Sequence, residues 1–303
     1  MSIWNDWRTA IENKYPEMKL LEAEPLSRHT SFRIGGPADF MAFPTSEEEL
    51  AFLLRTAAEH GVKAAILGAG TNVLADDAGK QGLVICTRDC LDQIRLLDAT
   101  TLEVYCGAMM AKAAMVARDH SLTGLEFAHG IPGTVGGGVF MNAGAYGGEI
   151  KQVAISTTVM LMDGTTRTYE ADAQGFAYRH SAFQGLDCVI LKTVFRLEKG
   201  DKQAITERMQ ELALKRRTSQ PLDMPSAGST FKRPVGAYAA ALIDQCGLKG
   251  VGVGQAAVSE KHAGFVVNLG GATAQNVLDT IRLIQKTVKQ ETGFDLETEV
   301  KIF

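Results

Sequence analysis

The spacing of apolar residues predicts helices and short strands in alternation along the chain. Near the N-terminus, Trp4, Trp7 and Ile11 recur at helical spacing. This spacing predicts an amphipathic helix within residues 1–22 that contributes packing rather than chemistry.

A strand–helix–strand unit is predicted in the first quarter of the chain. Ser46 and Glu49 have the spacing of a capping box, and apolar residues then recur at helical spacing until Gly61 ends the helix. Residues 64–67 form an apolar run that is typical of a buried strand. This strand leads into the glycine-containing segment 68–74 at its carboxyl end, where ligands gather in such folds.

The middle of the chain is rich in predicted strands. Residues 154–162 and 165–170 flank Asp163-Gly164, which predicts a β-hairpin with a two-residue turn. Residues 188–197 form a further apolar strand. The pattern to this point is that of a mixed α+β fold.

A change in composition at residues 198–201 marks the predicted start of a second domain. A charged helix over 202–217 opens this domain, and helices over 237–246 and 273–293 follow. The last predicted strand, residues 296–303, alternates between apolar and charged positions. Its charged face is either a solvated edge or a functional surface, and the pattern alone leaves both open.

Residues 130–148 hold eight of the chain's 31 glycines and no Lys or Arg. Since glycine has no Cβ, such a run permits a tight packing corner between strands. It equally permits a path on which backbone amides approach an anion such as pyrophosphate. The run alone leaves both interpretations open. Segment 68–74 lacks the third glycine of a dinucleotide fingerprint and the Gly-Lys-Ser/Thr of a P-loop, so both of those nucleotide sites are excluded.

The composition favours a soluble globular protein over a nucleic-acid-binding or membrane-spanning one. A chain of 303 residues with 46% hydrophobic and 22% charged content is long enough for about two globular domains. The formal charge of −4 gives no basic field for nucleic acid, and no apolar run is long enough to span a bilayer. The N-terminal residues lack the features of a secretory signal, so a cytoplasmic location is expected.

The cysteines and histidines do not predict a metal site. The five cysteines contain no Cys-x-x-Cys pair, and the six histidines contain no His-x-x-x-His pair. We therefore expect buried thiols, no disulfide framework and no bound metal.

Several separated blocks together resemble the family of UDP-N-acetylenolpyruvoylglucosamine reductases, flavoenzymes of bacterial peptidoglycan precursor synthesis. The resemblance covers nearly the whole chain, and the order and number of its blocks make it specific. In the first two thirds the blocks are Thr30–Asp39, Gly68–Leu74, Gly124–Phe127, Gly130–Gly148 and Tyr178–Phe183. In the last third they are Pro225–Pro234, Leu248–Gly250, Val258–Ala263 and Leu296–Val300.

The resemblance implies an α+β fold with two functional parts. An FAD-binding domain of the vanillyl-alcohol-oxidase type would span residues 1–200, in α+β subdomains at about 23–95 and 96–200. A C-terminal α+β substrate-binding domain would span residues 201–295. The strand 296–303 would return near the active site.

The resemblance also implies non-covalent FAD, with NADPH as the hydride donor. Both glycine runs would then wrap the FAD pyrophosphate with backbone amides. The cofactor-binding residues so implied are Arg33, Gly68, Ala69, Gly70, Thr71, Asn72, Val73, Leu74, Gly130, Ile131, Pro132, Gly133, Thr134, Gly136, Gly137, Asn142, Ala143, Gly144 and Tyr146.

Three catalytic residues are implied by the matching blocks, namely Arg179, Ser229 and Glu299. The guanidinium of Arg179 suits a substrate carboxylate toward which negative charge spreads in the transition state. Ser229 would give a proton to the second carbon, which requires exact placement and support from nearby cations. An ionised Glu299 would repel the developing charge, so we expect it to be protonated or to act through a neighbouring group.

The short connection between Arg179 and Ser229 resembles the second type of this reductase. That type lacks the loop whose tyrosine clamps the substrate diphosphate in the first type. Arg233 is the first candidate for the diphosphate, with Lys232 and Gln220 as further choices and Tyr178 as another substrate-binding residue. The departures from the family pattern are Thr71 for Ser, Gly138 for Ala, Gly264 for Asn, Lys301 for Arg and the absence of a closing Gly.

The resemblance implies reduction of UDP-N-acetylglucosamine enolpyruvate to UDP-N-acetylmuramate with NADPH. Two alternatives stay open. One is another FAD oxidoreductase acting on a small alcohol or sugar, and the other is a non-catalytic protein that binds flavin or a nucleotide sugar. We expect a cytoplasmic monomer whose partners are small molecules, neither nucleic acid nor membrane.

Overall fold

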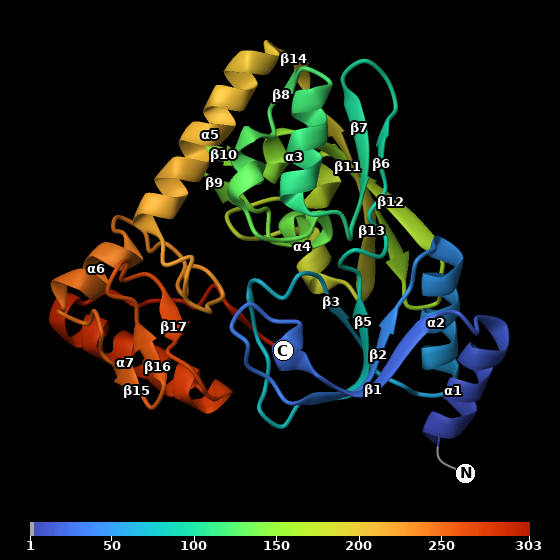
Figure 1. Ribbon diagram of the computed structural model, residues 1–303, viewed down its shortest axis with the longest axis horizontal. Helices are drawn as coiled ribbons and strands as arrows, with labels where there is room; N and C mark the ends of the chain where they lie inside the picture. The colour runs from blue at the N-terminus through green and yellow to red at the C-terminus, as the bar shows by residue number, and fades with distance from the viewer. Residues whose placement is uncertain (1–2) are drawn as a thin grey trace. The chain divides into compact units, whose positions relative to one another are not determined.

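The computed structural model describes residues 3–303, and contacts within it divide the chain into two compact units (Figure 1). Unit 1 contains the described residues up to Glu22 together with Phe40–Ala69 and Gln81–Leu214. Unit 2 contains Ala23–Asp39, Gly70–Lys80 and Lys215–Phe303. The predicted domain limits differ from these units, because unit 2 takes in two segments from the first 80 residues. The assignment of FAD and substrate to particular domains stays a prediction.

The first sheet of unit 1 has the strand order β1-β2-β5-β3. Its strands are β1 (Lys19–Pro25), β2 (Pro37–Phe43), β5 (Lys80–Cys86) and β3 (Ala64–Leu67), and β3 pairs with β5 in parallel. Helices α1 (Ile3–Lys14) and α2 (Glu47–Glu59) lie side by side at this sheet (Figure 1). Trp7 and Ile11 of α1 are buried, as their spacing predicted. The side chain of Trp4 lies outside the described part of the chain.

The cap of α2 forms in part as predicted. The Ser46 hydroxyl accepts a hydrogen bond from the Glu49 amide at 3.1 Å, which satisfies one of the exposed amides of the first turn. The Glu49 carboxylate, however, accepts from the amide of Thr45 at 2.6 Å. The helix therefore has a serine cap, and its reciprocal contact lies one residue earlier than in a capping box.

The second sheet of unit 1 is antiparallel, with the order β12-β11-β13-β7-β6. Its strands are β12 (Thr166–Glu170), β11 (Ala154–Leu161), β13 (Cys188–Arg196), β7 (Thr101–Tyr105) and β6 (Ile94–Leu96). Shorter pieces of the unit are β8 (Leu122–Thr123), β9 (Gly144–Ala145), β10 (Gly148–Glu149), β14 (Glu198–Lys199) and four 3-10 turns, Glu126–Gly130, Ile150–Gln152, Ala171–Gln174 and Ala182–Gly185. Helix α3 (Met110–Asp119) packs on α4 (Val135–Phe140), and α4 packs on β7 and β13 (Figure 1).

The predicted hairpin between β11 and β12 forms, but the predicted turn length is wrong. Met160 pairs with Thr166, and the amide of Leu161 donates to the carbonyl of Thr165, so three residues make the loop. Gly164, the last of them, has φ of 80°, a left-handed conformation that glycine adopts without strain. The Asp-Gly pair therefore ends a three-residue loop rather than forming a two-residue turn.

Unit 2 has its own apolar core around a small antiparallel sheet, β15 (Gly252–Val253), β16 (Ala256–Val258) and β17 (Val266–Asn268). Helix α7 (Ala274–Thr292) packs on this sheet and on α6 (Ala239–Gln245) (Figure 1). Apolar residues at helical spacing along α7 are buried, namely Val277, Ile281, Ile284 and Val288. Helix α5 (Lys202–Ser219) begins in unit 1 and ends in unit 2, and Leu26–Arg28 forms a 3-10 turn in unit 2.

Both ends of α7 follow from the sequence. The Thr273 hydroxyl accepts from the Asn276 amide at 3.1 Å, and Gly293 ends the helix with φ of 79°. The Asp77 carboxylate also accepts from the first amides of the helix, at 2.8 Å from Ala274 and 3.2 Å from Gln275. A negative charge stabilises the positive end of the helix dipole, so residues 70–80 are held to α7 within unit 2.

The C-terminal strand is shorter than predicted. Only β18 (Lys301–Ile302) is a regular strand, and it pairs in parallel with β4 (Val73–Leu74). Val300 is buried as expected, but Ile302 is 58% exposed. The predicted alternation of faces therefore fails at the last residues, where the short pairing leaves the side chain of Ile302 uncovered.

Within residues 3–303, no helix is both long and apolar enough to cross a membrane.

The five cysteines are free thiols whose pKa values are raised by burial. Burial raises the pKa of Cys106 to about 12 and the pKa values of Cys90 and Cys188 to about 11. Because the thiolate is the reactive form, we expect iodoacetamide at pH 8 to label Cys90, Cys106 and Cys188 of the native protein roughly 100-fold more slowly than in the urea-unfolded chain. Mass spectrometry of both samples measures this difference. Rapid labelling of native Cys106 would contradict the expectation.

Candidate active site

The two glycine-containing segments meet in unit 1. Thr134 caps α4, with its hydroxyl accepting from the Gly137 amide at 3.4 Å. Gly68, at the end of β3, lies so close that a Cβ on it would stand 2.6 Å from Oγ1 of Thr134. A side chain at position 68 would therefore separate the two segments.

Four glycines of residues 130–148 are required by packing inside the protein, and one of them is Gly144, where a Cβ would lie 2.6 Å from the carbonyl oxygen of Gly148. A Cβ on Gly136 would lie 2.8 Å from Cβ of Cys106, and one on Gly138 would lie 2.8 Å from Sδ of Met110. A Cβ on Gly148 would lie 2.5 Å from the ring of Phe127. Gly137 differs, because it is exposed and a Cβ there would meet only Oγ1 of Thr134 at 3.6 Å. The run therefore forms a packing corner and leaves Gly137 on its open side.

Backbone amides at this corner fit an anionic group. Ala69 is 7% exposed and Thr134 is 1% exposed, yet neither amide nitrogen has a hydrogen-bond acceptor among residues 3–303. Buried N–H groups are almost always paired, so two unpaired ones in adjoining segments call for an external acceptor. Since residues 130–148 contain no Lys or Arg, the backbone supplies the donors. The corner fits the pyrophosphate of FAD.

Arg179 lies in a tight turn of unit 1. The amide of Ala177 donates to the carbonyl of His180 at 3.0 Å, and the His180 amide donates back at 3.1 Å. Arg179 has φ of 53°, which is uncommon for a residue with a side chain. Its Nη2 donates to the carbonyl of Gly144 at 3.3 Å, and its guanidinium carbon lies 5.0 Å from the centre of the Tyr178 ring.

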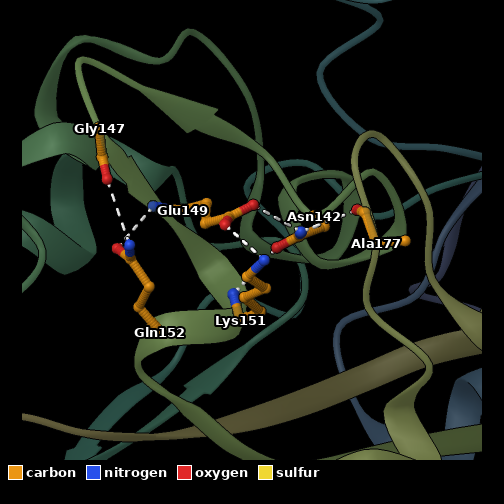
Figure 2. Close-up of polar contacts among 6 residues, drawn as sticks. All are labelled: Asn142, Gly147, Glu149, Lys151, Gln152 and Ala177. Carbon is orange, nitrogen blue, oxygen red and sulfur yellow. Dashed lines mark hydrogen bonds and ion pairs between the residues drawn. The ribbon is translucent and has the colours of Figure 1, made fainter.

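Asn142 is fully buried, and three hydrogen bonds use its side chain (Figure 2). Its Nδ2 donates to Oε2 of Glu149 and to the carbonyl of Ala177, both at 2.9 Å, and its Oδ1 accepts from the Lys151 amide at 2.9 Å. Both N–H groups of the carboxamide are therefore used within the protein. Any contact between Asn142 and FAD, which stays a prediction, would involve other atoms.

The segments that contain Ser229 and Glu299 pair with each other in unit 2, although the two positions are 70 apart in the sequence. The Glu299 amide donates to the carbonyl of Thr230 at 2.9 Å, next to Ser229, and the Lys232 amide donates to the carbonyl of Glu297 at 2.8 Å. This antiparallel pairing fixes the spacing of the two segments. Ser229 itself is exposed.

Segment 70–74 joins the same cluster in unit 2. Nδ2 of Asn72 donates to the carbonyl of Glu299 at 3.2 Å, and the Lys301 amide donates to the carbonyl of Asn72 at 3.0 Å. Gly70 has φ of 61°, and a Cβ on it would lie 2.0 Å from the carbonyl oxygen of His29. Only glycine fits there, since both the backbone conformation and the space exclude a side chain.

Ser31 connects segments of the candidate site, although the sequence pattern does not mark it as a site residue. Its amide donates to the carbonyl of Gly70 at 3.0 Å, and its hydroxyl donates to the carbonyl of Ser226 at 2.6 Å. It thereby joins three of the blocks that carry the family resemblance. Its place inside the first of those blocks was the only available signal. Arg33, two residues later, is exposed and has φ of 56°.

The residues predicted to bind substrate differ in their surroundings. Nζ of Lys232 forms an ion pair with Glu297, and the guanidinium of Arg233 lies 3.8 Å from the centre of the Tyr238 ring. Oε1 of Gln220 is buried without a hydrogen-bond partner among the described residues. Tyr178 is 51% exposed beside Arg179. Arg179 and Tyr178 belong to unit 1, and the other three belong to unit 2.

Comparison with known proteins gives consistent matches over both parts of the chain. Residues 38–170 match the profile of an FAD binding domain, and residues 220–303 match that of the UDP-N-acetylenolpyruvoylglucosamine reductase C-terminal domain. The UDP-N-acetylenolpyruvoylglucosamine reductase of Limosilactobacillus fermentum is 44% identical over 289 residues, which is 95% of each chain. That of Caldanaerobacter subterraneus is 44% identical over 94% of each chain.

Solved structures agree with the sequence matches. The crystal structure of UDP-N-acetylenolpyruvylglucosamine reductase from Thermus caldophilus superposes with a TM-score of 0.79 at 33% identity, over 95% of this chain and 99% of that one. Alkyldihydroxyacetonephosphate synthase, at 16% identity and a TM-score of 0.51, covers 64% of this chain and shares the fold alone. The predicted α+β fold class with an FAD-binding domain is confirmed. The resemblance seen in the sequence blocks is confirmed as well, and the chain belongs to the UDP-N-acetylenolpyruvoylglucosamine reductase family.

Proposed function

We propose that this protein catalyses the reaction for which its family is named, the NADPH-dependent reduction of UDP-N-acetylglucosamine enolpyruvate to UDP-N-acetylmuramate in peptidoglycan precursor synthesis. FAD, held by the backbone of segments 68–74 and 130–148, would supply the hydride carrier between NADPH and the methylene carbon of the enolpyruvyl ether. The observation that carries the proposal is the pairing of the Ser229 and Glu299 segments, held by Asn72 from the predicted FAD-binding segment. A binding protein or a different oxidoreductase would not need this pairing.

The protein side of the reaction is divided among three residues. Arg179 would stabilise the negative charge that spreads toward the substrate carboxylate, because a guanidinium offers two parallel donors to a carboxylate. Ser229 would donate the proton to the second carbon. Glu299 would be protonated or would act through a neighbouring group, since an ionised carboxylate would repel the growing charge.

The protein's small-molecule partners are proposed to be NADPH and the UDP-linked sugar. The partners of Lys232 bear on how the diphosphate binds, because Glu297 would have to give up this cation. Arg233 is our first choice, since a planar guanidinium matches the geometry of a phosphate with paired donors. We further propose the second type of this reductase, without a tyrosine clamp, acting as a cytoplasmic monomer with non-covalent FAD.

The test of the proposed function is an anaerobic titration of the purified holoenzyme. NADPH should remove the flavin absorbance near 450 nm, and only the enolpyruvyl nucleotide sugar should restore it. Small alcohols and sugars are the controls. They are added to the oxidised protein to see whether they bleach the flavin, and to the reduced protein to see whether they restore its absorbance. Flavin that NADPH does not bleach would favour a binding protein, and flavin bleached by a sugar would favour a different oxidoreductase.

A further inference from the structure

We propose that Asn142 is a positioning residue that holds the Arg179 turn in place through Ala177 and Glu149. The inference rests on the proposed function, because it takes Arg179 to be the residue that stabilises charge on the substrate. It concerns unit 1 alone. The residues that carry it lie in three separate segments of that unit, around positions 142, 149 and 177 (Figure 2).

The contacts of Asn142 and Arg179 close a ring. Asn142 donates to the carboxylate of Glu149 and to the carbonyl of Ala177, each at 2.9 Å. Glu149 pairs with Gly144 in the short β9–β10 hairpin. The carbonyl of Gly144 then accepts from Nη2 of Arg179 at 3.3 Å, and Arg179 lies in the turn that begins at Ala177. Asn142 therefore fixes both the base of the turn and the hairpin that its arginine contacts.

Asparagine suits this position for two independent reasons. Its φ of 42° is left-handed, a conformation that Asn adopts more readily than other residues with side chains. Its carboxamide also supplies two N–H donors for two acceptors and an oxygen for the Lys151 amide. Aspartate would lose both donors and place a second carboxylate against Glu149. Because Asn142 is fully buried, none of its three contacts competes with water.

A second contact holds the turn from its other end. Nε2 of Gln184 donates to the carbonyl of Arg179 at 3.0 Å and to that of Phe140 at 2.9 Å. Phe140 is the last residue of α4 and lies two residues before Asn142, so both contacts tie the turn to the segment around the end of α4. A φ of 53° at Arg179 requires such support, since the surrounding contacts must hold a strained backbone.

The test uses Asn142→Gly, because glycine keeps the left-handed backbone and removes only the side chain. Loss of a buried hydrogen bond should raise amide hydrogen exchange at Ala177 and His180 by about tenfold in the holoenzyme. The rate at which substrate restores the flavin absorbance should fall by about tenfold as well. FAD content is measured in parallel, and the rate of the substrate step is expressed per bound flavin. Asn276→Gly, which removes the side-chain oxygen that accepts from the amides of Thr273 and Gln255 in unit 2, is the control and should change neither quantity.

A double variant separates this inference from the proposed function. If Asn142 acts through Arg179, the Asn142→Gly change should slow the substrate step less than about twofold in an Arg179→Ala background. A full tenfold effect in that background, unchanged exchange at His180, or loss of FAD from Asn142→Gly would each overturn the positioning role. If Arg179→Ala alone leaves the substrate step at the parent rate, the proposed function of Arg179 fails, while the exchange rates still decide whether Asn142 holds the turn.

A gentler variant covers the case in which Asn142→Gly does not fold. Glu149→Gln keeps an acceptor oxygen for Asn142 but removes its charge, which weakens that hydrogen bond. We expect exchange at His180 to rise by about threefold, with the control amides of α7 unchanged. Exchange equal to that of the parent protein would overturn the inference.

Discussion

Ser229→Ala should leave bleaching of the flavin by NADPH at the parent rate and slow its return on adding substrate by about 10²–10⁴-fold, the usual contribution of a positioned proton donor. The two half-reactions separate because the first needs no proton on substrate carbon. Ser229 is exposed and follows Gly228, which has φ of 75°, so the loss of one hydroxyl should not disturb the fold. Stopped-flow absorbance under anaerobic conditions measures both rates in one preparation.

Two further variants make this result specific to the Ser229 hydroxyl. Ser226→Ala is the matched control in the same segment, because Ser226 accepts from Ser31 through its carbonyl, which the change preserves. Ser229→Cys retains a group that can lose a proton and should recover part of the rate. Parent-like turnover of Ser229→Ala would remove Ser229 from the mechanism, and equal slowing in Ser226→Ala would indicate a general effect on the segment.

The regular elements of the fold could be predicted because each leaves a local signal. Helix α7 lies within the predicted range 273–293, and its Thr273 cap, buried apolar stripe and closing Gly293 are all local features of that segment. The turn of the β11–β12 hairpin could not be predicted in the same way. Asp163-Gly164 is compatible with loops of two or three residues, and the pairing of Met160 with Thr166 decides between them.

The sequence could predict which segments form the candidate site, but it could not predict the contacts between them. The family blocks named the segments around Arg179, Ser229 and Glu299, yet no periodicity relates Asn72 to Glu299 or Ser31 to Ser226. Such pairings depend on tertiary packing, to which a single sequence gives no direct access. The partners of Lys232 and Asn142 cannot be predicted from the sequence for the same reason. Glu297, Glu149 and Ala177 reach these two side chains only in the folded chain.

Gly136→Ala and Gly137→Ala should have opposite effects on stability, although the two residues are neighbours in α4. A methyl group on Gly136 would stand 2.8 Å from Cβ of Cys106, so overpacking should lower the free energy of unfolding by about 1–3 kcal/mol. A methyl group on Gly137 would meet only Oγ1 of Thr134 at 3.6 Å. Alanine favours a helix over glycine, so the second change should raise the stability of FAD-depleted protein by up to about 1 kcal/mol.

The Gly136→Ala and Gly137→Ala variants also distinguish an effect on packing from an effect on FAD binding. If Gly137 lies along the path of the FAD pyrophosphate, as predicted, its added methyl group should raise the Kd for FAD by about tenfold or more while the FAD-depleted protein is stabilised. Gly136→Ala should raise the Kd for FAD only to the extent that it lowers the stability of the packing corner. Urea unfolding of FAD-depleted protein and quenching of flavin fluorescence measure the two quantities separately. Unchanged FAD affinity in Gly137→Ala would leave the glycine run as a packing corner, and the unpaired amides of Ala69 and Thr134 would then need another acceptor.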